Sequence, residues 1–266
     1  MKNLFENLKR ENRAALAIFI TCGDPDLEFT EKLVERVCAS GADIVELGVP
    51  FSDPMADGKT IQMSSARAIK SGATFAKVLD MVARLRAKGV DKKFVLFSYF
   101  NPIFHYGTRR AAEMSKEAGV DAWLVVDVPM EESGEIRTEL APLGLGFIPL
   151  AAPTSSLGRV REISEHGGGF LYYVSVAGVT GARNALPEGF AERINGVRKA
   201  SKLPVGVGFG ISTPEMAAQV AAVADAVIVG SKFVDTVHRA YVEGGESAAL
   251  DAAEKFVAPL AAKMGR

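Results

Sequence analysis

A glutamate inside an apolar segment is the side chain best placed for acid–base chemistry. Glu46 lies within the apolar segment 43–49, and its neighbours Ile44 and Gly48 share its face of the predicted strand. A carboxyl on an apolar wall has its pKa raised towards the range in which a general acid–base works. The alternative is a structural carboxylate that is paired with a lysine.

An aspartate in the loop that follows favours the catalytic interpretation. Asp57 lies in a stretch punctuated by Pro54 and Gly58, which can fold back over the end of the strand. Two carboxyls in different environments hold different protonation states and divide the work of a reaction. Asp53, in the same loop, directly precedes a proline, so we expect it to cap a turn or to contact a partner.

Two glycine-rich segments late in the chain predict a site for a phosphate group. Segments 206–214 and 230–231 each end an apolar stretch and begin a helical pattern. Backbone N–H groups at helix starts bind phosphate, and barrels commonly bind it after strands seven and eight. Glycines that only permit tight turns are the alternative. The candidate residues are Gly208, Phe209, Gly210, Gly230 and Ser231.

A small-residue segment and several large apolar residues complete the candidate site. Segment 175–184 has two glycines and polar ends, which is typical of a mobile lid. In such a lid the backbone of Gly181 could approach the phosphate. An ordinary surface loop is the alternative. Large residues in or beside the predicted strands either form the wall of an aromatic pocket or belong to the core. These are Phe19, Tyr99, Leu124, Leu150 and Tyr172.

Eight short apolar segments are the predicted strands that position these residues. Most of them are nearly continuous runs, which is typical of parallel strands covered by helices on both faces. A doubly wound open sheet is the alternative, but it normally shows GxGxxG after the first strand, and segment 22–26 reads CGDPD. The segments are 15–21, 43–49, 94–99, 122–128, 146–151, 170–176, 204–209 and 226–230.

The stretches between these segments have apolar residues at helical spacing. Thr30, Thr74, Ser156 and Thr213 precede such patterns and are the predicted helix starts. Residues 1–10 have the same periodicity and predict an additional helix at the amino end. We therefore expect an α/β protein with a (βα)8 barrel formed as a single domain by residues 1–266.

Composition excludes several classes of protein. Of 266 residues, 48% are hydrophobic, and 31 basic side chains balance 32 acidic ones, which excludes disorder and disfavours nucleic-acid binding. Two cysteines and three scattered histidines lack the spacing of a metal site. No apolar run is long enough to span a membrane and no signal peptide is evident, so we expect a cytoplasmic protein.

The segment 46–62, ELGVPFSDPMADGKTIQ, resembles the signature of the tryptophan synthase alpha chain family. Further family-like stretches occur in the same order along the chain. They are ITCGDPD, SYFNPIFHYG, VVDVPMEES, LAAPTSS, VSVAGVTGAR, GVGFGIS and IVGSKF. The resemblance implies a (βα)8 barrel that cleaves indole-3-glycerol phosphate to indole and glyceraldehyde 3-phosphate, with no cofactor of its own. It also implies a beta-chain partner that holds pyridoxal phosphate, in an alpha2beta2 heterotetramer.

The resemblance assigns a role to each candidate residue. Glu46 corresponds to the general acid–base, and Asp57 to the acceptor of the indole N–H. Phe19, Tyr99 and Leu124 correspond to the indole pocket, with Tyr172 near the glutamate. Gly181, Gly208, Phe209, Gly210, Gly230 and Ser231 correspond to the phosphate site, and Thr180 to the lid hinge. Asp53, Asn101 and Pro129 correspond to the surface that contacts the beta chain.

Two positions depart from the family pattern. Lys59 replaces a proline beside the Asp57 loop, and Val176 stands where some members have an arginine. Three other functions stay open at this stage: a free-standing indole-releasing lyase, a non-catalytic scaffold for a beta chain, and a phosphate-binding barrel isomerase.

Overall fold

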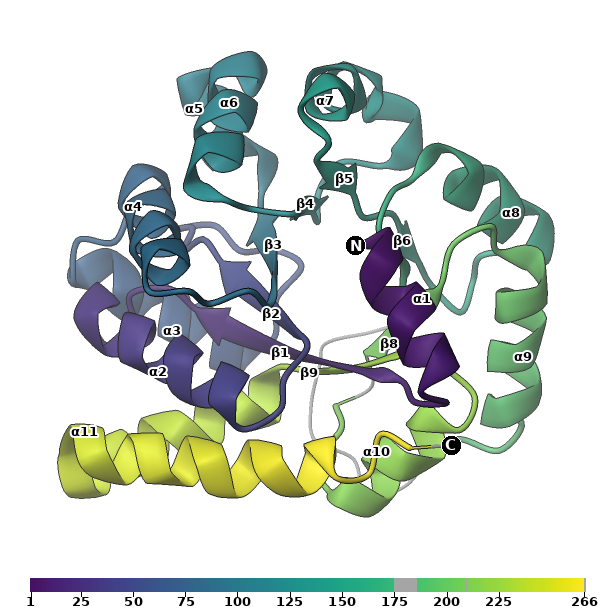
Figure 1. Cartoon of the computed structure of the whole chain (residues 1–266). Coiled ribbons are helices and arrows are strands. Elements are labelled where there is room, and N and C mark those ends of the chain that lie inside the picture. Colours follow the sequence, from purple (N-terminus) through teal and green to yellow (C-terminus); the bar gives the residue numbers. More distant parts are fainter. Residues whose placement is uncertain (175–185, 209, 266) are drawn as a thin grey trace.

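The described residues form a parallel sheet that curls into a barrel (Figure 1). This computed structural model describes residues 1–174, 186–208 and 210–265. Within them the order of the nine strands is β5-β4-β3-β2-β1-β9-β8-β7-β6, and every pair is parallel. The strands are β1 Ala15–Thr21, β2 Ile44–Gly48, β3 Lys93–Ser98, β4 Ala122–Val125, β5 Gly146–Phe147, β6 Leu150–Ala151, β7 Leu171–Val174, β8 Val205–Gly208 and β9 Ala226–Val229.

The predicted fifth strand is divided into β5 and β6, the two end strands of that order. Only Ile148 and Pro149 separate them, so the chain itself closes the ring. The Ile148 N–H still donates to the Trp123 carbonyl at 2.8 Å, and the Pro149 carbonyl accepts from the Tyr172 N–H at 2.9 Å. Proline has no N–H to give to a ladder, which explains the break at this point. The barrel prediction is confirmed, with this one interruption.

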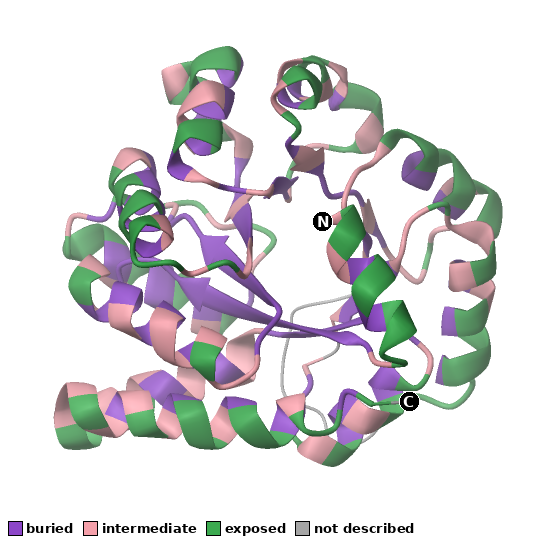
Figure 2. Cartoon of the chain, viewed as in Figure 1, coloured by how far each residue is buried: buried purple, intermediate pink, exposed green. Residues whose placement is uncertain are grey.

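Helices surround the strands in an outer ring, except that α1 lies across one end of the barrel (Figure 1). They are α1 Lys2–Arg10, α2 Leu27–Ala39, α3 Lys59–Lys70, α4 Phe75–Ala87, α5 Phe100–Tyr106, α6 Thr108–Ala118, α7 Gly134–Leu140, α8 Leu157–His166, α9 Phe190–Ala200, α10 Pro214–Ala221 and α11 Ser231–Ala261, with short 3-10 turns η1 Met130–Glu132 and η2 Ala141–Leu143. Burial follows this arrangement, since the strands are buried and the helices expose their outer faces (Figure 2).

Three of the four predicted helix starts are confirmed. The side chains of Thr74, Ser156 and Thr213 each accept a hydrogen bond from the backbone N–H three residues later. The start predicted at Thr30 is wrong, because Asp26 caps α2 by accepting from the Phe29 N–H at 2.8 Å. The Thr30 hydroxyl lies inside that helix and donates to the Asp26 carbonyl at 2.7 Å.

The predicted amino-terminal helix, α1, seals one end of the barrel. Its side chains Phe5 and Leu8 belong to the cluster inside the barrel, together with Ala15 and Ala226, which begin their strands. A separate and larger cluster lies between the strands and the outer helices. With the amino ends of the strands covered by α1, the carboxyl ends are the place for a site.

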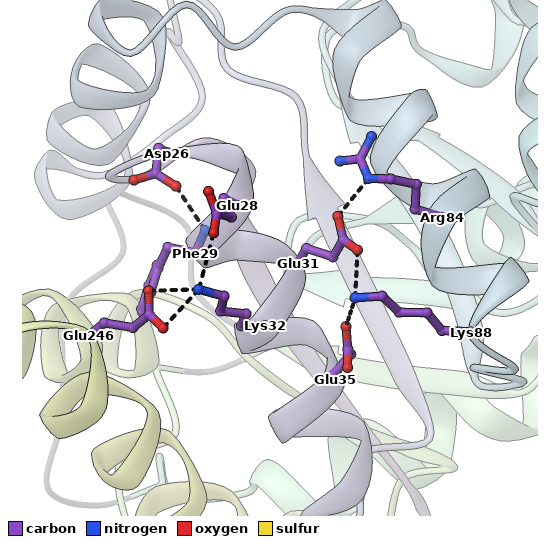
Figure 3. Close-up of polar contacts among 9 residues, drawn as sticks. All are labelled: Asp26, Glu28, Phe29, Glu31, Lys32, Glu35, Arg84, Lys88 and Glu246. Atoms are coloured by element: carbon purple, nitrogen blue, oxygen red, sulfur yellow. Dashed lines mark hydrogen bonds and ion pairs between the residues drawn. The ribbon is translucent and has the colours of Figure 1, made fainter.

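Ion pairs connect α2 with two neighbouring helices (Figure 3). Glu31 accepts from Arg84 of α4 at 2.8 Å and from Lys88, the residue that caps the end of α4, at 2.7 Å. On another face of α2, Lys32 donates to Glu246 of α11 at 2.9 Å. No described helix has the combination of length and apolar character needed to cross a membrane.

Candidate active site

A cavity of about 850 Å³ opens at the carboxyl ends of the strands. Its size lies within the range of small-molecule sites. Residues from opposite sides of the barrel line it, including Phe19 of β1, Glu46 of β2, Tyr172 of β7 and Gly208 of β8. Asp57 reaches it from the loop that follows β2. The two carboxyl groups predicted from the sequence therefore face one cavity.

Glu46 is completely buried in the wall of this cavity. The strand register places it between Phe19 of β1 and Val95 of β3. Neither of its carboxyl oxygens has a hydrogen-bond partner among the described residues. Burial raises the pKa of Glu46 to about 8. The alternative of a structural ion pair with a lysine therefore has no support in the described part of the chain.

Asp57 is held in its loop by three hydrogen bonds. The Tyr99 hydroxyl donates to Asp57 Oδ2 at 3.1 Å, and the Asp57 N–H donates to the Pro54 carbonyl at 3.1 Å. The Gln62 side-chain amide, in the first turns of α3, donates to the Asp57 carbonyl at 2.8 Å. Burial raises the pKa of Asp57 to about 6, and the hydrogen bond from Tyr99 acts in the opposite direction.

Aromatic side chains form part of the cavity wall. Phe19 and Phe97 both line it, with their rings edge to face and centroids 5.0 Å apart. Gly48 makes room for this pair, since a Cβ added there would lie 2.5 Å from Phe19 Cζ. Tyr172 also lines the cavity, and burial followed by the charges of Glu46 and Asp57 raises its pKa. Its hydroxyl therefore stays protonated and remains a possible donor.

Two residues predicted for the aromatic pocket do not line the cavity. Leu124 is fully buried in the cluster inside the barrel, and Tyr99 lies under the loop, with its hydroxyl on Asp57. Conversely, Phe97 lines the cavity and the sequence analysis missed it. Nothing separates Phe97 from the other apolar residues of its segment, so only the strand register could have identified it.

The glycine-rich ends of β8 and β9 also reach the cavity. Gly208, Gly210, Gly230 and Ser231 line it. Ser231 begins the long helix α11, so its backbone N–H lies at the positive end of the helix dipole. Gly210 has a φ of 58°, a conformation that favours glycine. The predicted residues Phe209, Thr180 and Gly181, and the departure at Val176, lie outside the described residues.

The residues predicted for partner contact are exposed. Asp53, Asn101 and Pro129 all lie on the surface. The Asp53 carboxylate accepts from the hydroxyl of the adjacent Ser52 at 2.5 Å. Lys59, which departs from the family pattern, is the exposed first residue of α3.

Cationic and metal-binding groups contribute little to this cavity. Arg159 of α8 lines it, but its guanidinium pairs with Glu131 at 2.6 Å and with Glu162 at 3.2 Å. Across the part of the chain that is described, no three His, Cys, Asp or Glu side chains gather into a possible metal site. The available chemistry is therefore that of the carboxyls of Glu46, Asp57 and Asp127, the hydroxyls of Tyr172, Ser155 and Ser231, and backbone N–H groups.

Comparison with known proteins points to one family. The family model described as tryptophan synthase alpha chain matches residues 5–264. The chain is 54% identical to the tryptophan synthase alpha chain of Geobacter sp. over 230 residues, which is 86% of each chain. It is 52% identical to that of Geobacter sulfurreducens over 235 residues, 88% of this chain and 89% of the relative.

Solved structures agree with this result. The tryptophan synthase subunit alpha of Legionella pneumophila superposes with a TM-score of 0.91 at 38% identity, covering 99% of this chain and 97% of that one. A Mycobacterium tuberculosis tryptophan synthase structure superposes with a TM-score of 0.89 at 32% identity, covering 99% and 97%.

Proposed function

The chain belongs to the tryptophan synthase alpha chain family, and we propose that Glu46 and Asp57 carry out its reaction. That reaction is the cleavage of indole-3-glycerol phosphate to indole and glyceraldehyde 3-phosphate, so the chain is a lyase. The observation that carries the assignment is Glu46, a buried carboxyl that faces the cavity with no hydrogen-bond partner among the described residues.

In the first step, Glu46 acts as an acid. With a pKa of about 8 its carboxyl is mostly protonated at neutral pH, and it donates that proton to the ring carbon that bears the glycerol chain. The indole ring becomes cationic. Asp57, with a pKa of about 6, is mostly ionised and accepts a hydrogen bond from the ring N–H, which stabilises the new positive charge.

In the second step, the same glutamate acts as a base. The Glu46 carboxylate removes the proton from the hydroxyl on the adjoining glycerol carbon. The carbon–carbon bond breaks, its electron pair returns to the ring, and the hydroxyl carbon becomes the aldehyde. Glu46 gives one proton and regains one, so a single residue in an apolar wall serves both steps.

The ends of β8 and β9 suit the phosphate of the substrate. Backbone N–H groups near Gly210, Gly230 and Ser231 would bind the anion at the start of α11. Phe19 and Phe97 would contact the indole ring, with Tyr172 beside the glutamate. We also assign the phosphate roles predicted for Gly181 and Phe209, and the hinge at Thr180, on family resemblance alone.

The proposed partner is a beta chain, and the proposed assembly is an alpha2beta2 heterotetramer in the cytoplasm. Family membership implies a beta partner, and the exposed residues Asp53, Asn101 and Pro129 are the proposed contact surface. We assign pyridoxal phosphate to that partner, where it supplies the condensation of indole with serine. The chemistry proposed for this chain needs no cofactor.

Release of indole from indole-3-glycerol phosphate tests the proposal. We expect Glu46→Gln and Asp57→Asn to lower kcat by about 10²–10⁴-fold with or without a beta chain, because each removes one partner in proton transfer or charge stabilisation. Glu117→Gln, an exposed carboxyl on α6, is the matched control and should retain wild-type turnover.

The same assay separates the remaining alternatives. Wild-type turnover in Glu46→Gln would contradict the mechanism. A wild-type chain that releases no indole even with a beta chain would indicate a scaffold. Full turnover without any beta chain, unchanged when one is added, would indicate a free-standing lyase.

A further inference from the structure

We infer that Tyr99 is a positioning residue that holds Asp57 and couples it to α5, the helix that begins at the next residue. The inference rests on the proposed role of Asp57 and adds a means by which a partner could act on it. It differs from the role in the indole pocket that the family resemblance implies for Tyr99, because Tyr99 does not line the cavity.

The Tyr99 hydroxyl connects to two consecutive residues of the loop. It donates to Asp57 Oδ2 at 3.1 Å and accepts from the Ala56 N–H at 2.9 Å. The side chain itself is 3% exposed, and its ring packs against the Phe51 ring with centroids 5.2 Å apart. The phenol therefore fixes both the path of the loop and the direction of the carboxylate.

Little else from outside the loop holds it in place. Ser52, Asp53 and Met55 are exposed. Among the described residues, Tyr99 is the only side chain from beyond this loop and α3 that hydrogen-bonds to residues 50–57. Loss of its hydroxyl therefore removes both described hydrogen bonds between residues 56–57 and the residue that follows β3.

Tyr99 is also the residue that directly precedes α5. The Phe100 N–H, at the first residue of α5, donates to Asp127 Oδ1 at 2.8 Å, which ties the helix start to the loop after β4. Further along α5, Asn101 is exposed and Phe104 is 67% exposed. A beta chain that binds this exposed face would move the backbone directly attached to Tyr99.

The electrostatics agree with a positioning role. Burial raises the pKa of Asp57, and the hydrogen bond from Tyr99 lowers it. Burial, followed by the charge of Asp57, raises the pKa of Tyr99 well above its ordinary value, so its hydroxyl remains a donor. The other titratable groups that face this pair are Asp127 on the Tyr99 side, and Glu46 and Tyr172 in the cavity wall.

The pH profile of kcat/KM for indole release tests the inference with Tyr99→Phe. Without the hydroxyl, ionisation of Asp57 is less favourable, so we expect the acid limb to move to higher pH by on the order of one unit. Stimulation of indole release by a beta chain should fall by about threefold or more. Tyr106→Phe, which removes a hydroxyl from the other end of α5, should change neither quantity.

A second measurement needs no turnover. NMR titration of carboxyl-labelled aspartate in the free chain should show the same upward shift for Asp57 in Tyr99→Phe. An unshifted Asp57 pKa, or undiminished stimulation by the beta chain, would overturn the inference. The proposed function fails separately, if Asp57→Asn keeps wild-type turnover, so the two failures are distinguishable.

Discussion

At the scale of single residues, the two proposed catalytic carboxyls, Glu46 and Asp57, differ in the hydrogen bonds that they accept. Glu46 has none among the described residues, and burial alone sets its pKa at about 8. Asp57 is only half-buried and accepts from Tyr99, and its pKa is about 6. At neutral pH one group is an acid and the other an anion, which is the division of labour that the proposed reaction needs.

The buried Glu46 makes the stability of the protein depend on pH. Its pKa in the folded state is about 8, against about 4.3 in an unfolded chain. The folded state therefore holds its proton more tightly, and this contribution to stability is lost as pH rises from the unfolded to the folded pKa. We expect Glu46→Gln to gain stability over wild type by at most about 4 kcal/mol between pH 5 and pH 8.

Urea unfolding across that pH range checks this expectation, with Glu117→Gln as the control that shows no such trend. A difference between Glu46→Gln and wild type that stays constant with pH would mean that Glu46 is not held neutral in the folded protein. A gain in stability together with a loss of turnover would also show that this carboxyl is retained for chemistry at a cost to folding.

The sequence identifies residues that stand out by type, and not those that act through their contacts. A carboxyl in an apolar strand and another in a Pro/Gly loop mark Glu46 and Asp57 without any structure. The hydrogen bond from Tyr99 to Asp57 joins residues that are 42 positions apart in the sequence. It depends on the path of the loop that carries Asp57, and no local sequence pattern encodes that path. The same is true of Phe97, since its place in the cavity wall follows from the register of β3.

At the scale of elements, the barrel is predictable because continuous apolar runs and helical periodicity alternate along the chain. The exceptions have local physical causes. Pro149 interrupts the fifth strand because it lacks an N–H, and Asp26 replaces Thr30 as the cap of α2 because its carboxylate reaches the Phe29 N–H. Each exception depends on a single backbone N–H group, whereas the apolar periodicity that predicts the helices and strands is averaged over many residues.

The start of α11 yields a prediction about substrate binding. Ser231 lies in the cavity at the first position of the helix, so Ser231→Asp places a negative charge where the phosphate is proposed to bind. We expect KM for indole-3-glycerol phosphate to rise about tenfold or more, because the new aspartate and the substrate phosphate are both negatively charged and repel each other strongly in a cavity away from bulk water. Steady-state kinetics measures the effect.

Ser247→Asp is the matched control for this change, because it adds the same charge at an exposed residue of α11 that lies beyond the non-helical Gly245 and does not line the cavity. Its KM should equal that of wild type. Equal KM values for the two variants would place the phosphate elsewhere. Substitution of Gly208 is a poorer test, since a Cβ there would lie 2.8 Å from the Tyr172 hydroxyl and would disturb packing as well as binding.

At the scale of the whole molecule, two kinds of contact hold the barrel together. Apolar side chains of α1 fill its amino end, so that the cavity at the other end is closed from below. Ion pairs on the surface then join α2 to α4 and α11, helices that are far apart in sequence (Figure 3). The stability that comes from the apolar packing of α1 is independent of pH, whereas the stability that comes from the ion pairs depends on it.

Glu31 is the group through which this dependence can be measured. Burial raises the pKa of its carboxyl, but the hydrogen bonds from Lys88 and Arg84 together outweigh burial, so the pKa lies below its ordinary value. Because the pKa is depressed on folding, the stabilisation is present above about pH 4.3 and is lost as pH falls through the folded value. The partners are about half exposed, which limits the effect.

We therefore expect Glu31→Gln to lower the free energy of unfolding by about 1 kcal/mol at pH 7 and low salt. The loss should shrink in 1 M salt, which screens the pairs, and should also shrink as the pH is lowered below about 4.3, because the wild-type carboxyl is then progressively protonated. Urea unfolding of both chains under these three conditions makes the comparison. A loss of stability that is equal under all three conditions would assign the role of Glu31 to packing of its side chain between α2 and α4. Indole release should be unaffected in either case, because α2 and α4 contribute no residue to the described cavity wall.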